Sequence, residues 1–159
     1  PIASFARIKP LEADKAGGAD SSKRISRWDE IAGTVEMTGV GGPGPGGAKT
    51  FEHMAATLPP EATQAHVYDV IAAPLVARWL GGVDVDLISY GQTGSGKTFT
   101  MFGPPHSMAH AAAALGGGGG TISGEGILRD EHGFILRSGF DALAAVAASN
   151  ARGAPALLH

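Results

Sequence analysis

The chain has 159 residues and contains no cysteine, which excludes disulfide bonds and thiolate metal sites. It also lacks any apolar run close to the ~20 residues that a membrane-spanning helix needs. No basic start followed by an apolar stretch suggests a signal peptide. Together these absences favour a cytosolic location. The first residue is Pro1 rather than Met, so we expect the natural N-terminus to lie outside this sequence.

Positive charge is also scarce. The net charge is −3 and the pI is about 6.1, so no overall positive field attracts nucleic acid or another acidic polymer. Any such contact must be local or lie outside this sequence. Large apolar side chains are few as well, because alanine makes up much of the 43% hydrophobic content. We therefore expect one loosely packed domain or a part of a larger one.

The first half of the chain predicts short strands. Residues 2–10 begin as a strand, which Pro10 ends because proline donates no ladder hydrogen bond. Residues 34–38 alternate at period two and predict a strand, or one arm of a hairpin with residues 24–31. Glycine and proline dominate residues 41–47, which predicts a flexible surface loop.

Residues 63–80 change to the pattern of a helix. Val67, Ile71, Leu75 and Trp79 recur every four residues and form an apolar face. Pro74 removes one helical hydrogen bond, which predicts a kink or a break between two short helices. The pair of glycines at residues 81–82 then predicts the end of the helix through a left-handed cap.

Residues 83–90 end in an apolar run and predict a buried strand, and residues 97–101 can start a helix. A last helix is expected from about residue 137 to residue 149, although Gly139 weakens the pattern. Between these helices, alanine and glycine repeats near residues 111–120 predict a floppy insertion. Strands and helices in this order indicate an α/β fold.

Residues 91–98 fit the phosphate-loop pattern G-x-x-x-x-G-K-[ST] at every position. Such a loop follows a strand, opens a helix, and directs backbone N–H groups at one anion. Lys97 would face the β- and γ-phosphates, and Thr98 would offer its hydroxyl to Mg²⁺. The alternative is an ordinary glycine-rich turn. The predicted nucleotide-binding residues of the loop are Gly91, Gln92, Thr93, Gly94, Ser95, Gly96, Lys97 and Thr98.

The sequence from residue 90 to residue 101, Y-G-Q-T-G-S-G-K-T-F-T-M, resembles the phosphate loop of kinesins, Y-G-Q-T-x-S-G-K-T-x-T-M. Weaker similarities follow the kinesin order, at residues 5–10 (R-x-R-P), 51–52 (Phe-Asp), 63–76 (the first helix with its internal proline) and 133–137 (G-I-I-P-R). The resemblance implies a partial kinesin-like P-loop NTPase sheet with flanking helices. It implies that residues 1–159 are the N-terminal part of an incomplete motor domain, with insertions near residues 39–49 and 109–124.

The resemblance also implies where the base of ATP or ADP would lie. Arg7 and Pro10 occupy the positions that flank the adenine ring in kinesins, with Lys9 nearby, and Phe99 occupies the position that stacks on the ring. An aromatic face against a purine is physically sensible. The alternative for Arg7 and Lys9 is a pair of solvated charges on an edge strand.

The sequence departs from kinesins in several places. Lys9 replaces a frequent arginine, Leu136 replaces the proline of G-I-I-P-R, and residues 83–85 replace Tyr-Asn-Gly. The two switch sequences, N-x-x-S-S-R and D-L-A-G-S-E, are absent. Because those elements position the attacking water and sense the γ-phosphate, we expect Mg-ATP or Mg-ADP binding with little or no turnover by this chain. We assign no catalytic residue.

Other ionisable residues are weaker candidates. His106 and His110 have the spacing of helical metal ligands but no evident third ligand, and a solvated loop is the simpler interpretation. Asp84, Asp86 and the acidic pair at residues 130–131 are interpreted as solvated charges.

The resemblance implies an ATP-driven, cytoskeletal motor whose partner is the microtubule, contacted through regions mostly absent here. No nucleic acid or membrane partner is expected. Two alternatives remain: a different P-loop NTPase, and a truncated or degenerate kinesin-like module that serves as an interaction surface.

Overall fold

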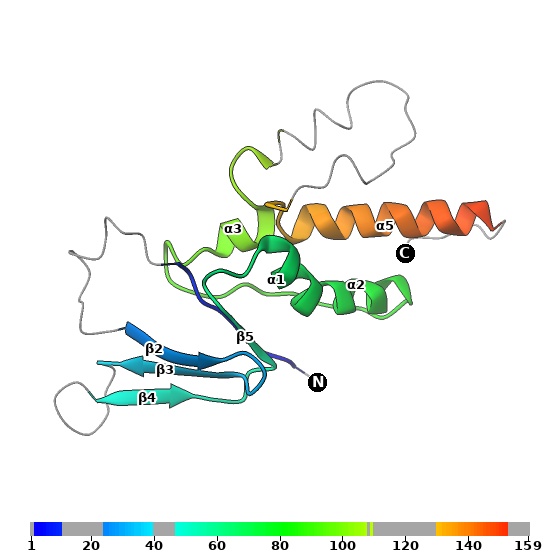
Figure 1. Cartoon of the computed structure of the whole chain (residues 1–159). Helices are drawn as coiled ribbons and strands as arrows, with labels where there is room; N and C mark the ends of the chain where they lie inside the picture. The colour runs from blue at the N-terminus through cyan, green and yellow to red at the C-terminus, as the bar shows by residue number, and fades with distance from the viewer. Residues whose placement is uncertain (1, 11–23, 40–46, 108, 110–129, 153–159) are drawn as a thin grey trace. The chain divides into compact units, whose positions relative to one another are not determined.

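The computed structural model describes residues 2–10, 24–39, 47–107, 109 and 130–152. The chain divides into two compact units, Pro1–Ala62 and Thr63–His159. The first unit contains five short strands and the second contains four helices, within the described residues (Figure 1). The mixture confirms the predicted α/β class. No described helix combines the length and the hydropathy required to cross a bilayer.

Two strands of the first unit form a parallel pair. Strand β1 (Phe5–Arg7) pairs with β5 (Ala56–Leu58), so that Phe5 lies opposite Ala56 and Arg7 opposite Leu58. The Ile8 N–H extends the ladder by donating to the Leu58 carbonyl at 3.0 Å. Leu58 is completely buried, which places this pair in the core of its unit.

The other three strands form an antiparallel sheet in the order β2 (Arg24–Asp29), β3 (Thr34–Thr38) and β4 (Ala48–Phe51). The predicted hairpin between residues 24–31 and 34–38 is confirmed, with a register shift between Ile25 and Arg27. The Asp29 carboxylate accepts a hydrogen bond from the Ala32 N–H at 2.8 Å and fixes the turn. Strands β4 and β5 were not predicted. The loop predicted at residues 41–47 lies outside the described residues except for Gly47.

The second unit begins with two helices separated by a break. Thr63 caps α1 (Gln64–Ile71), because its hydroxyl accepts the His66 N–H at 3.1 Å. Helix α2 (Ala73–Leu80) carries Pro74 in its first turn, where a missing N–H is tolerated. The predicted break is confirmed at Ala72. Helix α2 ends at the two glycines, of which Gly82 has the left-handed φ of +85°.

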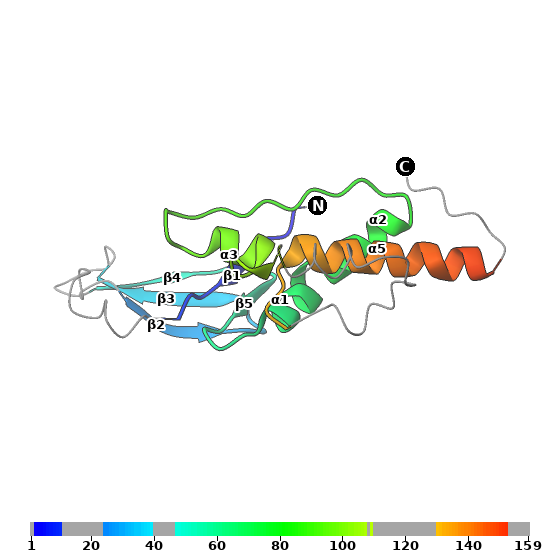
Figure 2. The same cartoon turned by 90° about the horizontal axis from the view of Figure 1, so that it is seen from above.

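Residues 83–90 do not form the predicted strand. They run back along the second unit from α2 toward α3 (Lys97–Phe102), and no described segment pairs with them (Figure 2). Val85 and Leu87 are partly buried, whereas Ile88 is 87% exposed and Tyr90 is 99% exposed. The segment has the side-chain alternation of a strand but no partner for its backbone groups, and without a partner a ladder cannot form.

Helix α5 (Phe134–Ala151) contacts α1, α2 and α3. It is longer at both ends than the predicted helix at residues 137–149. Its start meets the end of α3 through backbone: a Cβ on Gly133 would lie 2.5 Å from the Gly103 nitrogen. The insertion predicted near residues 111–120 lies outside the described residues.

Polar side chains, of which Tyr68 and Arg137 are buried, join α1 to α5. The Tyr68 hydroxyl donates to the Asp141 carboxylate at 2.5 Å, and the Tyr68 ring meets Phe134 edge-on at 6.1 Å between centroids. The Arg137 guanidinium lies 5.9 Å from the centre of the Tyr68 ring and donates from Nε to the His132 carbonyl at 2.9 Å. Burial raises the pKa of Tyr68, and the hydrogen bond to Asp141 raises it further. We call Tyr68, Phe134, Arg137 and Asp141 the α1–α5 joint.

Candidate functional site

The loop at residues 91–98 leads into α3, as the phosphate-loop pattern predicts, but the segment before it is extended without forming the expected strand. Gly94 and Gly96 have φ values of +79° and +98°. At Gly96, which caps α3, a side chain would meet no neighbouring atom, so the left-handed backbone alone requires glycine. Gly91 has a φ of +155°, which also favours glycine, and a Cβ there would lie 2.5 Å from the Ser95 hydroxyl. The glycines therefore let the loop close tightly upon itself.

Lys97 crosses this loop. Its ammonium donates to the carbonyls of Gly91 at 2.7 Å and Gln92 at 2.9 Å. The Gln92 carbonyl also accepts the Ser95 N–H at 3.1 Å, which forms a turn inside the loop. The one cation within residues 91–98 is thus held against the loop backbone.

Side chains that would contact a nucleotide remain accessible. Lys97 and Thr98 line a shallow hollow of about 380 Å³ together with residues 87–89, Met101 and Phe102. Thr98, Gln92, Thr93 and Gly94 are exposed, and Phe99 is 45% exposed. The ammonium of Lys97, the exposed Thr98 and the aromatic ring of Phe99 therefore lie together where the accessible loop leads into α3.

Helix α3 has six residues, and its Phe99 carbonyl accepts two hydrogen bonds. The Gln64 side-chain amide donates a short hydrogen bond to the Phe99 carbonyl, and the Gly103 N–H donates to that carbonyl at 2.8 Å. Sequence reasoning missed this role of Gln64. The residue lies one helical turn before Tyr68 on the same face, and a polar side chain on a buried face generally has a hydrogen-bond partner.

The predicted base-binding residues Arg7, Lys9 and Pro10 belong to the first unit, so their proximity to the loop stays a prediction. Arg7 is partly buried in β1, and this burial lowers the pKa of its guanidinium. Lys9 and Pro10 are exposed.

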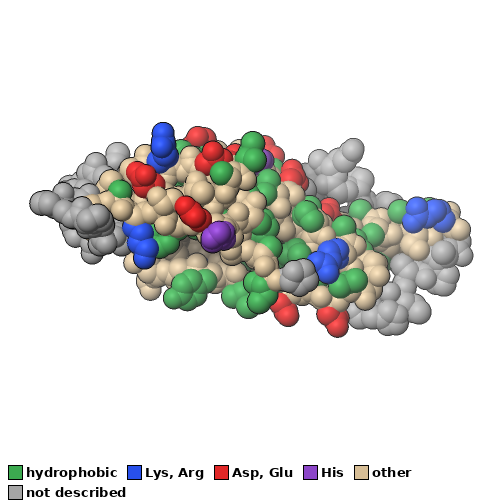
Figure 3. All heavy atoms as spheres, turned by 90° about the horizontal axis from the view of Figure 1, so that it is seen from below, with side chains coloured by type: hydrophobic (Ala, Val, Ile, Leu, Met, Phe, Trp, Pro, Cys, Tyr) green, Lys and Arg blue, Asp and Glu red, His purple; other side chains and the backbone are tan. Residues whose placement is uncertain are grey.

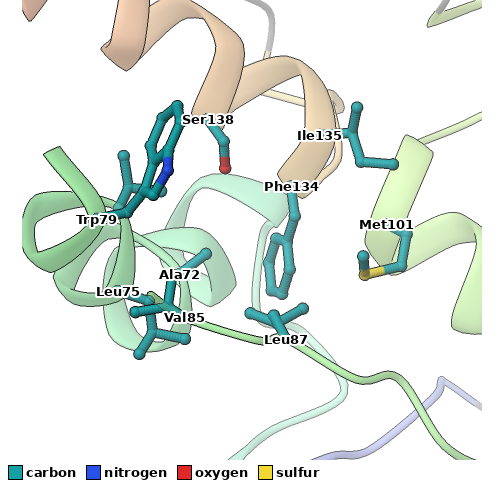
Figure 4. A pocket seen from close by; sticks show the side chains of 10 residues that line it. Ala72, Leu75, Trp79, Val85, Leu87, Met101, Phe134, Ile135 and Ser138 are labelled. Atoms are coloured by element: carbon teal, nitrogen blue, oxygen red, sulfur yellow. The ribbon is translucent and has the colours of Figure 1, made fainter. Parts of the chain in front are cut away.

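A second hollow, of about 350 Å³, is apolar (Figure 4). Phe134 at the start of α5 points into it toward Leu87, and Trp79 of α2 lies at its other side beside Ser138. The Ser138 hydroxyl and the Trp79 indole N–H are the polar groups among its lining side chains, and none of these side chains is charged. This hollow has no group that could hold phosphate, so it is not part of the candidate site.

The other ionisable candidates do not gather into a site. His106 Nε2 lies 3.3 Å from the Glu131 carboxylate, while His110 is outside the described residues. Asp84, Asp86 and Asp130 are exposed. Among described side chains, no group of three His, Cys, Asp or Glu could hold a metal ion. On the face that Figure 3 draws, the described Lys and Arg side chains stand singly, without a basic patch.

Comparison with known proteins gives consistent matches. A sequence model of the kinesin motor domain matches residues 7–131. Kinesin-like protein KIN-12A of Arabidopsis thaliana is 43% identical over 102 residues, which cover 64% of this chain and 7% of that protein. Human kinesin-like protein KIF15 is 34% identical over 106 residues, or 67% of this chain and 7% of KIF15. Arabidopsis KIN-14G is 38% identical over 104 residues, 65% of this chain and 10% of that protein. The chain therefore spans a tenth or less of the length of these curated relatives.

Proposed function

The chain belongs to the kinesin motor-domain family, and from this premise we propose that residues 91–98 bind the phosphates of Mg-ATP or Mg-ADP. The observation that carries the proposal is the loop itself. Glycines at left-handed φ values close the loop at the start of α3, and the Lys97 ammonium lies against it. A bound phosphate group would replace the carbonyls of Gly91 and Gln92 as the hydrogen-bond acceptor of the Lys97 ammonium. The ammonium would then bond to a charged acceptor instead of two neutral ones.

The accessible residues suit the groups of such a ligand. Thr98 would offer its hydroxyl to Mg²⁺, an ion that prefers oxygen ligands and would neutralise phosphate charge when bound. Phe99 would stack on the adenine ring through its exposed face. Arg7 and Pro10, with Lys9 nearby, would complete the base site in the folded motor domain.

In the protein to which this chain belongs, we propose that the site drives an ATPase that moves along microtubules as part of the cytoskeleton. The 159 residues would form the N-terminal part of the motor domain. They contain neither N-x-x-S-S-R nor D-L-A-G-S-E, so we expect nucleotide binding without appreciable hydrolysis by this chain alone.

The test compares the wild-type chain with Lys97→Ala and with Lys49→Ala as a matched control. Lys49 lies in β4, 5.2 Å from the centre of the Phe51 ring, and takes no part in the loop. Titration with a fluorescent ADP in Mg²⁺ should show a roughly ten- to hundredfold loss for Lys97→Ala, as expected for ~1.5–3 kcal/mol from a charged hydrogen bond. Lys49→Ala should bind like the wild type. Equal affinity of wild type and Lys97→Ala would rule out the proposed site.

A further inference from the structure

The helix that carries the nucleotide-contacting residues cannot maintain its own position. Helix α3 has six residues, fewer than the ~12 at which an isolated helix becomes even marginal, so tertiary contacts must hold it. Its Phe99 carbonyl accepts two N–H groups, one from Gly103 within the same turn and one from the Gln64 side chain. Of these two donors, only the Gln64 side chain belongs to another element, so its hydrogen bond links α3 to α1.

Gln64 is well placed to act as a fixed anchor. It is the first residue of α1, in a turn whose backbone is held by the Thr63 cap. Its exposed fraction is 4%, so its carboxamide has little access to water. Breaking a hydrogen bond of a buried amide costs more than breaking one in water, which favours retention of the bond to Phe99.

We propose that Gln64 is a positioning residue for the nucleotide site, which rests on the proposed function of residues 91–98. Phe99 directly follows Lys97 and Thr98 in the first turn of α3. Fixing its carbonyl fixes the turn from which the ammonium, the hydroxyl and the aromatic ring project. Gln64 acts through the backbone of α3, at the Phe99 carbonyl.

Tyr68 offers a matched control within the same helix. It lies one turn after Gln64 and is also buried, and its hydroxyl bonds to Asp141 of α5 rather than to α3. Removing either hydrogen bond loosens α1 from a neighbouring helix. Only the removal at Gln64 takes away a hydrogen bond to the helix that carries Lys97 and Thr98, a helix that also packs on α5.

The experiment compares Gln64→Met and Gln64→Leu with Tyr68→Phe in the whole 159-residue chain. Both Gln64 variants should bind fluorescent ADP with Mg²⁺ about three- to tenfold more weakly than wild type, the loss expected for one neutral hydrogen bond. Tyr68→Phe should lower the thermal unfolding midpoint while binding within about twofold of wild type. Wild-type affinity in both Gln64 variants, or an equal loss in Tyr68→Phe, overturns the proposal.

Hydrogen exchange without nucleotide separates this proposal from the proposed function. The amides of residues 100–103 should exchange faster in the Gln64 variants than in wild type or Tyr68→Phe, because α3 loses its anchor. Unchanged exchange contradicts the anchor even if Lys97→Ala shows that the site binds nucleotide. Conversely, equal binding by wild type and Lys97→Ala rejects the nucleotide site, while faster exchange would still support the contact between Gln64 and α3.

Discussion

The nucleotide loop and the α1–α5 joint belong to the same unit, but the Lys97 ammonium bonds within its own loop, whereas Tyr68 and Asp141 bond across two helices. In the loop, Lys97 bonds only to backbone carbonyls, and Thr98 faces an open hollow. In the joint, Tyr68 and Asp141 bond directly to each other, while Arg137 donates to the carbonyls of His132 and Asp130. The Lys97 ammonium can exchange its two loop carbonyls for a ligand without separating two helices, whereas the bond between Tyr68 and Asp141 holds α1 to α5.

This contrast predicts that substitutions can separate stability from binding. Changes in the joint should lower the free energy of unfolding and leave the nucleotide affinity of the folded chain nearly unchanged. Changes to Lys97 or Thr98 should do the reverse, whereas changes to the loop glycines should also strain the backbone. Unfolding and ADP affinity, measured on the same variants, test that separation.

Phe134→Ala should give the largest loss of stability, about 3 kcal/mol, at the lower end of the range for a buried aromatic residue. Phe134 is 4% exposed and packs on Tyr68, but its ring already borders the apolar hollow, which limits the additional void. Denaturant unfolding measures the change. Leu143→Ala on the same helix is the control. Leu143 is 45% exposed, so its substitution should lower the free energy of unfolding much less. Equal losses in the two variants would contradict the central position of Phe134.

Gly96→Ala should strain the loop by about 1–2 kcal/mol, because an L-residue at its φ of +98° adopts the left-handed conformation. No atom lies near the added methyl group, so the strain is purely conformational. Gly139→Ala is the opposite control: this glycine lies inside α5 with space around it, and alanine should stabilise the helix by about 0.5–1 kcal/mol. Thermal unfolding and ADP titration of both variants test the contrast. A stabilised Gly96→Ala would contradict the described loop.

The pH dependence of the joint should be the smallest effect. Because the pKa of Tyr68 is raised in the folded chain, the unfolded chain loses this proton first as the pH rises. Stability from Tyr68 is therefore complete below the ordinary tyrosine pKa of ~10 and falls above it, by at most ~1.4 kcal/mol per pH unit. Denaturant midpoints across alkaline pH should fall less steeply in Tyr68→Phe than in wild type. Tyr90→Phe, which changes the exposed second tyrosine, should retain the wild-type slope.

Local sequence rules were sufficient where the deciding interactions are local. The phosphate-loop glycines, the break at Pro74 and the hairpin at residues 24–38 each depend on backbone limits or on neighbours close in the chain. Strands β4 and β5 have four and three residues, too few for a periodic pattern to be recognised. Residues 83–90 show the converse: a strand-like pattern predicts a strand only when another segment supplies its hydrogen bonds.

In the candidate site, too, the residues close in sequence could be predicted and the distant one could not. Gly91 to Thr98 could be found from spacing alone, because the chemistry of phosphate binding constrains consecutive residues. Gln64 could not, because its partner Phe99 lies 35 residues away and is contacted through a backbone carbonyl, which every residue type possesses.

The close approach of Gly103 and Gly133 has a consequence for how this fold can vary. Gly103 follows the end of α3, and Gly133 precedes the start of α5; their backbones are in close contact. His106 and Glu131, which lie between these two glycines in the sequence, also contact each other. For a chain that departs from and returns to one place, the entropy of closure grows only with the logarithm of its length. Insertions and deletions between α3 and α5 should therefore be tolerated without displacing Lys97, provided that Gly103 and Gly133 are both retained.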